Sequence, residues 1–193
     1  LLRRMGADIC GEGSSRIEVC GVERLFGTVF DVLGDRIAAG TYLAAVAGAG
    51  GHVRILKGPW EFMQEEIRVF RQIGAEVEPI SSKTGEVCGI ELWMEKRPKA
   101  ISLSTGPYPG FPTDLQSPML AVLSRAEGIS QVREEVFEAR FKTAGQLQKM
   151  GAQIEVSGNY ARILCHQRLL GARVQAMDLR VRAARAPAGV AAC

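Results

Sequence analysis

The chain has 193 residues, of which 47% are hydrophobic and 23% are charged, and its mean hydropathy is +0.04. This composition excludes an intrinsically disordered chain and predicts a globular protein that could form one large domain or two small ones. The net charge of +3 comes from 24 basic and 21 acidic residues dispersed along the chain, so we expect no nucleic-acid partner.

Membrane and metal-binding classes are disfavoured as well. The longest apolar stretch, residues 42–51, is far shorter than the roughly 20 residues of a membrane helix. The cysteines lie far apart, which predicts no zinc site and reduced, buried packing thiols in a cytoplasmic protein. They are Cys10, Cys20, Cys88, Cys165 and Cys193. Because residues 1–5 read as the middle of a helix, we expect the true N-terminus to be missing.

One short pattern occurs three times along the chain, at residues 2–9, 70–77 and 147–154. Each copy has the end of an amphipathic helix, then a glycine suited to the left-handed position after a helix, then an alternating run typical of a strand. A second alternating run follows each copy, at residues 16–19, 89–92 and 161–164. The chain is therefore predicted to be a tandem repeat of helix–strand–strand units.

An aspartate follows each pair of predicted strands: Asp35, Asp114 and Asp178. Each is predicted to be the N-cap of a new helix. The next residues, 40–47 and 118–123, are apolar on every helical face, which predicts helices that are buried all round. The predicted fold class is therefore α/β (α+β), with helices inside, sheets outside and helix N-termini gathered at one end, where an anion would bind.

Asp114 stands out among the three aspartates. It follows a turn-rich run, residues 105–110, and the residues Phe111-Pro112-Thr113. Position alone favours a structural cap, since Thr-Asp before a helix is a common capping sequence. An N-cap carboxylate nevertheless stays at the surface, where a ligand can reach it.

Segments along nearly the whole chain resemble, in order, the family of UDP-N-acetylglucosamine 1-carboxyvinyltransferases, the enolpyruvyl transferases of peptidoglycan synthesis. The matching segments are Gly21-Val22-Glu23-Arg24-Leu25, Asp35-Arg36-Ile37 with Gly40-Thr41, Lys96-Arg97-Pro98-Lys99-Ala100, Phe111-Pro112-Thr113-Asp114, Val136-Phe137-Glu138 with Arg140-Phe141, Met150-Gly151-Ala152 and Asp178-Leu179-Arg180.

The resemblance implies a truncated inside-out α/β barrel fold, with residues 1–38 closing one domain and residues 39–193 forming most of the second, its last segment incomplete. It implies transfer of the enolpyruvyl group of phosphoenolpyruvate to the 3-hydroxyl of UDP-N-acetylglucosamine, with release of phosphate. These two substrates are the expected partners, together with the missing remainder of the chain. No metal or organic cofactor is implied.

The resemblance also assigns roles to four residues. Asp114 matches the carboxylate that contacts the 3-hydroxyl of the sugar and is the candidate proton acceptor, a role that requires hydrogen-bond reach of that hydroxyl. Val136 matches a residue whose backbone contacts the UDP-sugar. Arg140 and Arg180 match two arginines near the carboxylate of phosphoenolpyruvate, which a planar guanidinium can bind with two hydrogen bonds.

Some positions depart from the family. The family asparagine before Arg140 is Ala139 here, and residues 181–193 carry Arg182, Arg185 and Pro187 in place of a small apolar helix, so we expect that tail to fray or to be partly exposed. The family's reactive loop and phosphate-contacting lysine would precede this segment, and we expect the segment alone to be inactive. Two alternatives remain: the sister enzyme that acts on shikimate 3-phosphate, and a non-catalytic or degraded copy.

Overall fold

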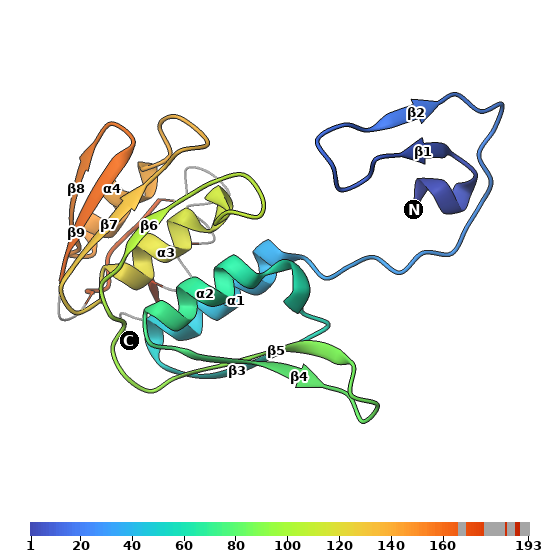
Figure 1. Cartoon of the computed structure of the whole chain (residues 1–193). Helices are drawn as coiled ribbons and strands as arrows, with labels where there is room; N and C mark the ends of the chain where they lie inside the picture. Colours follow the sequence, from blue (N-terminus) through green and yellow to red (C-terminus); the bar gives the residue numbers. More distant parts are fainter. Residues whose placement is uncertain (166–168, 176–183, 185–187, 190–193) are drawn as a thin grey trace. The chain divides into compact units, whose positions relative to one another are not determined.

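The computed structural model describes residues 1–165, 169–175, 184 and 188–189, and the chain divides into two compact units, Leu1–Leu33 and Gly34–Cys193 (Figure 1). The first unit contains the 3₁₀ turn η1 (Leu2–Met5) and an antiparallel ribbon of β1 (Asp8–Cys10) and β2 (Glu18–Cys20). None of residues 1–33 is buried within it. A ribbon of two strands is marginally stable alone, so this unit has no core of its own.

The second unit alternates helices and strands. Its helical elements are α1 (Arg36–Ala49), η2 (Trp60–Phe62), α2 (Gln64–Gln72), η3 (Thr113–Leu115), α3 (Gln116–Leu123) and α4 (Lys142–Lys149). Its strands are β3 (Gly51–Leu56), β4 (Glu76–Ser81), β5 (Val87–Met94), β6 (Ser102–Ser104), β7 (Ile129–Arg133), β8 (Gln153–Ser157) and β9 (Tyr160–Leu164).

These strands form two sheets in the described part of the chain. One has the order β3-β5-β4 and is antiparallel throughout. The other has the order β6-β7-β9-β8, in which the β6–β7 pair is parallel and the remaining pairs are antiparallel. Helices α1 and α2 pack against the first sheet, α3 and α4 pack against the second, and α1 packs against α3, so the helices lie between the sheets (Figure 1).

Helices α1 and α3 run parallel and very close together. A β-carbon placed on Gly40, near the start of α1, would lie 2.3 Å from Cδ1 of Leu115, just before α3. Near the other end, the Arg125 guanidinium, just after α3, donates to the carbonyl oxygen of Gly48. The small residues of α1 permit this approach, and the two helices begin at the same end of the unit.

The predicted repeat is confirmed in all three copies. Each predicted helix end is helical, and the glycine that follows it, Gly6, Gly74 or Gly151, has a positive φ of 95°, 101° or 92°. Each is followed by two strands that pair antiparallel: β1 with β2, β4 with β5, and β8 with β9. Local sequence therefore fixes these units, because a left-handed glycine ends a helix and alternation selects a strand.

The expected burial of the apolar helices is confirmed for α3 and wrong for α1. All eight residues of α3 are buried. Helix α1 buries only one side, and Tyr42 on its other side is 66% exposed. The reason is that α3 is enclosed by α1, α4 and β7, while the side of α1 that bears Tyr42 has nothing packed over it in the described residues.

The prediction of buried cysteines is also wrong, although the thiols are free as expected. The four described cysteines, Cys10, Cys20, Cys88 and Cys165, are exposed. They lie on the uncovered ribbon of the first unit or near strand ends, where alternation turns their side chains outward. Within the described residues, no helix is long and apolar enough to cross a membrane. The sheets of the described residues form no closed barrel, so barrel closure stays a prediction.

Candidate active site

Asp114 lies at the end of the unit where α1 and α3 begin, but it is not an N-cap. It is the second residue of η3, whose N-cap is Pro112, and α3 begins only after Leu115. Pro112 has an extended backbone, and its carbonyl oxygen accepts the N–H of Leu115, which tightens the helix entry into a 3₁₀ turn. The predicted cap is therefore wrong for Asp114. The carboxylate still lies in the first helical turn, where the helix dipole favours a negative charge.

The N-cap prediction is confirmed for Asp35. Its Oδ1 accepts the backbone N–H groups of Ile37 at 2.8 Å and Ala38 at 3.2 Å, at the start of α1. The two aspartates therefore occupy equivalent places in the repeat and have different local roles. Asp178 lies outside the described residues.

Asp114 is in contact with Arg140. Nη1 of Arg140 donates to Oδ1 of Asp114 at 3.4 Å, across 26 positions of sequence. The Arg140 side chain is only 12% exposed, because its guanidinium lies over the ring of Phe137 at 4.2 Å from the ring centroid. The Asp114 side chain is 47% exposed. The pair thus presents a carboxylate that solvent and ligands can reach, beside an arginine that is already held in place.

Arg140 comes from a loop, residues 134–141, that joins β7 to α4. Glu134 at the start of this loop is buried, and its Oε2 accepts the hydroxyl of Thr113 at 2.8 Å. Near the end of the loop, Ala139 has a φ of 54°, in the left-handed region that residues other than Gly, Asn and Asp seldom adopt. The loop therefore turns back toward η3 and brings Arg140 to Asp114.

A second cation lies at the start of α1. The Arg36 guanidinium pairs with Glu66 of α2 at 3.1 Å and lies 5.2 Å from the ring centroid of Tyr108, in the loop between β6 and η3. Burial raises the pKa of Glu66 above its ordinary value, although the charge of Arg36 acts in the opposite direction. This contact places the turn-rich loop next to the start of α1.

The starts of α1, α2, α3 and α4, the four α-helices of the described residues, meet at this end of the unit. The Arg36–Glu66 pair joins the start of α1 to that of α2, and the Thr143 hydroxyl donates to Oγ of Ser117 at 2.8 Å, which joins α4 to α3. Because α1 and α3 are parallel, their N-terminal ends lie at the same end of the unit as Asp114, Arg140 and Arg36. The predicted gathering of helix N-termini is confirmed for these helices, and such an arrangement favours negatively charged groups.

The predicted site residues that the structure describes do come together. Asp114 and Arg140 are in contact, and Val136 lies in the same loop as Arg140, with its backbone N–H donating to Oε1 of Glu134 at 3.0 Å. Arg180 lies outside the described residues, as do Arg182, Arg185 and Pro187 of the altered tail. Sequence reasoning missed Glu134 and the Arg36–Glu66 pair, because nothing local to either residue reveals a partner that is 21 or 30 positions away.

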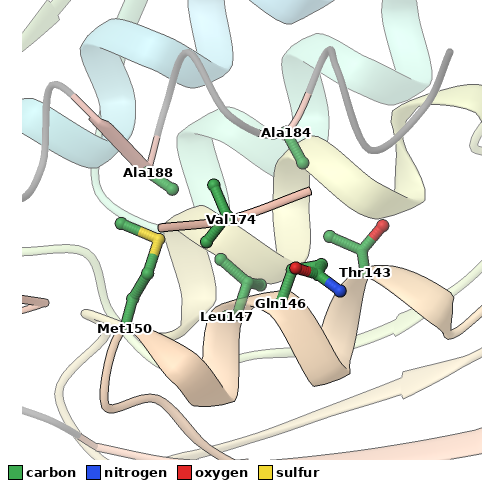
Figure 2. Close-up of a pocket in the computed structure, with 7 residues that line it drawn as sticks. All are labelled: Thr143, Gln146, Leu147, Met150, Val174, Ala184 and Ala188. Atoms are coloured by element: carbon green, nitrogen blue, oxygen red, sulfur yellow. The ribbon is translucent and has the colours of Figure 1, made fainter. Parts of the chain in front are cut away.

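A small pocket lies beside α4 (Figure 2). Leu147 of α4 and Met150, which follows α4, face Val174, Ala184 and Ala188, and both alanines are buried. The amide N–H of Gln175 donates to Oε1 of Gln146 at 3.0 Å, which fixes the returning chain on α4. Apolar side chains form most of the lining of this pocket, together with Thr143 and Gln146.

A sequence model described as EPSP synthase (3-phosphoshikimate 1-carboxyvinyltransferase) matches residues 1–193. The chain belongs to the EPSP synthase family. Curated relatives within this family are named UDP-N-acetylglucosamine 1-carboxyvinyltransferase. The protein from Thermotoga maritima is 41% identical over 191 residues, and that from Cereibacter sphaeroides is 44% identical over 192 residues. Both alignments cover 99% of this chain and 44% of the relative, so the chain spans less than half the length of these relatives.

Solved structures of the family have the same fold. The enolpyruvyl transferase NikO from Streptomyces tendae matches with a TM-score of 0.81 at 24% identity, over 98% of this chain and 44% of that chain. An EPSP synthase from Acinetobacter baumannii matches with a TM-score of 0.71 at 19% identity, over 98% of this chain and 46% of that chain. The mixed α/β architecture is therefore that of the enolpyruvyl transferases.

Proposed function

We propose that this chain contributes to an enzyme that transfers the enolpyruvyl group of phosphoenolpyruvate to the 3-hydroxyl of UDP-N-acetylglucosamine, an early step of peptidoglycan synthesis. The observation that carries the proposal is the 41–44% identity, across 99% of the chain, to relatives that bear the name of this activity. The contact between Asp114 and Arg140 supports it, since the two residues to which the resemblance assigns the reacting centre lie 3.4 Å apart.

In the proposed reaction, the 3-hydroxyl oxygen forms a bond to the enol carbon of phosphoenolpyruvate, the bond from that carbon to the phosphate oxygen breaks, and phosphate leaves. Asp114 takes the proton of the hydroxyl. Its half-exposed carboxylate can reach a bound sugar. Arg140 and Arg180 bind the carboxylate of phosphoenolpyruvate. No metal or organic cofactor takes part in the proposed reaction.

Val136 is proposed to contact the UDP-sugar through its backbone. Its N–H is bonded to Glu134, so we assign this contact to its carbonyl oxygen. The four helix starts at this end of the unit would favour the phosphate and carboxylate groups of both substrates.

The complete fold is proposed to be an inside-out α/β barrel, with residues 1–38 closing one domain and residues 39–193 forming most of the other. The full burial of α3 and the two sheets on either side of the helices support this arrangement. The enzyme is proposed to be cytoplasmic and to bind no nucleic acid.

The test uses a chimera in which residues 1–193 replace the aligned segment of the Thermotoga maritima relative. We expect the folded chimera to release phosphate from phosphoenolpyruvate when UDP-N-acetylglucosamine is present. Release with shikimate 3-phosphate instead would establish the alternative reaction that the family description names. The second alternative, a non-catalytic copy, is motivated by Ala139 and the altered tail. A folded chimera that binds UDP-N-acetylglucosamine in calorimetry but shows no turnover would favour it.

The 193-residue chain alone is proposed to be inactive, because the family's reactive loop and phosphate-contacting lysine match no residue within it. The same phosphate assay on this chain, with both substrates, is expected to give only the background rate. A rate well above background would contradict this part of the proposal.

A further inference from the structure

Glu134 is a buried acidic residue at the end of β7, only 2% exposed. Its carboxylate accepts three hydrogen bonds. Oε1 accepts the backbone N–H groups of Val136 at 3.0 Å and Phe137 at 3.1 Å, and Oε2 accepts the hydroxyl of Thr113 at 2.8 Å. Burial of a carboxylate is costly unless its oxygens are hydrogen-bonded, so these contacts explain how the residue is tolerated.

The three bonds join two segments of the candidate site. Thr113 precedes Asp114 in η3, and Val136 and Phe137 belong to the loop that carries Arg140. Phe137 is also the ring that covers the Arg140 guanidinium. One side chain therefore sets the distance between the turn that bears the carboxylate and the loop that bears the arginine.

The backbone around Glu134 is itself fixed by both neighbouring segments. The Glu134 N–H donates to the carbonyl oxygen of Asn159 at 2.8 Å, in the turn between β8 and β9. The N–H of Glu135 donates to Oγ1 of Thr105 at 3.0 Å, after β6. The backbone at Glu134 and Glu135 is thus held by these neighbouring segments, and the Glu134 carboxylate in turn joins the two segments of the site.

We propose that Glu134 is a positioning residue for the enolpyruvyl transfer: it fixes Asp114 and the loop with Val136 and Arg140 in the geometry that the substrates require. This inference rests on the proposed function. It does not require Glu134 to touch a substrate. A displacement of about 1 Å in a reacting group can lower a rate by about a hundredfold, so a residue of this kind affects catalysis without taking part in it.

Two conservative variants distinguish the effect of the length of the Glu134 side chain from the effect of its charge. Glu134→Gln keeps the length of the side chain; its carbonyl oxygen can accept the two backbone N–H groups, and its amide can donate to the Thr113 hydroxyl. Glu134→Asp keeps the charge but is one methylene shorter, and so it cannot reach both segments. In the chimera, we expect kcat/KM to stay within about threefold for Glu134→Gln and to fall about ten- to a hundredfold for Glu134→Asp.

The matched control is Glu135→Gln, the same change at the adjacent, exposed position, where the side chain pairs with Arg133 at 3.6 Å. Rates are measured well below the melting temperature of each variant, so that a loss of stability alone leaves them unchanged. An Asp variant that is as active as the Gln variant, or more active, overturns the proposal. Equal rates for all three variants do so as well.

Hydrogen exchange on the 193-residue chain gives a readout without turnover. The amide protons of Val136 and Phe137 are expected to be protected in the native chain and in Glu134→Gln, and to exchange about tenfold faster or more in Glu134→Ala, which removes the acceptor oxygens. Unchanged protection in the Ala variant would refute the positioning role. An inactive native chimera would instead count against the proposed function, so the two failures are distinguishable.

Discussion

The chemistry proposed for Asp114 depends on the contrast between two side chains in contact. Asp114 is about half exposed, whereas Arg140 is covered by Phe137 and keeps only 12% of its side-chain surface. Solvent screens an ion pair whose carboxylate is half exposed, so its contribution to stability is small. The pair is therefore better explained as a means of holding an arginine and an accessible carboxylate side by side than as a structural bond.

A change of Asp114 to Asn tests the proton-acceptor role. Asn keeps the shape and a carbonyl oxygen that can accept from Arg140, but it cannot take a proton. We expect kcat of the chimera to fall about 10²- to 10⁴-fold with a small change in KM for UDP-N-acetylglucosamine. Steady-state kinetics measure both values. The control is Glu155→Gln, which changes an exposed carboxylate on β8, and a kcat for Asp114→Asn near that of the control would remove the base role.

At the scale of elements, the loop of residues 134–141 is the least regular part of the site. It reverses direction at Ala139, whose φ of 54° is unfavourable for an alanine by about 1–2 kcal/mol. The resemblance implies an asparagine here, a residue that tolerates this conformation better. Alanine at this position therefore costs conformational energy. The sequence alone showed only that the residue differs from the one the resemblance implies.

Two changes of alanine to glycine are expected to act in opposite directions. Ala139→Gly relieves the left-handed strain and should raise the free energy of unfolding of the chain by about 0.5–1 kcal/mol, after the entropy cost of glycine. Ala38→Gly, at an exposed position in the first turn of α1, should lower it by a similar amount. Urea denaturation measures both. If Ala139→Gly lowered the free energy of unfolding as much as Ala38→Gly does, Ala139 would not have the left-handed conformation.

The close contact of α1 with α3 gives a second prediction for the elements. Gly40→Ala would place a β-carbon 2.3 Å from Cδ1 of Leu115, which must shift. Overpacking of this kind costs about 1–3 kcal/mol, and it would displace the residue that follows Asp114. Gly145→Ala in α4 is the control, because a β-carbon there meets nothing within 4 Å. It should not destabilise the chain, and a similar loss in both variants would argue against the close contact.

At the scale of the whole molecule, the packing of the helix starts buries the carboxylate of Glu66. Glu66 is 1% exposed, and burial raises its pKa even beside Arg36. Between the ordinary carboxyl pKa and this raised value, the folded chain binds more protons than the unfolded chain. The contribution of Glu66 to stability is therefore largest at low pH and falls as pH rises through that window.

Glu66→Gln should remove this dependence. We expect the free energy of unfolding of the native chain, relative to the Gln variant, to decline as pH rises from the ordinary carboxyl range and then to level off above the raised pKa. Urea denaturation across this range measures the difference, with Glu78→Gln as a control at an exposed carboxylate. A relative stability that increases with pH would show that the ion pair with Arg36 outweighs burial.

The sequence by itself determined the repeat, the places of the helices and strands, and the family, because these depend on short-range features. A glycine in the left-handed conformation ends a helix whatever surrounds it, and alternation over five residues selects a strand. Asp114, Val136 and Arg140 could be marked in the same way, one motif at a time.

Only the tertiary structure decided how those residues act together. The 3₁₀ turn at Asp114, the Arg140 contact, the bracing by Glu134 and the one-sided burial of α1 all depend on partners from distant segments. Local propensity carries no information about such partners. Their positions follow from the packing of α1 against α3 and from the sheet that fixes the loop after β7.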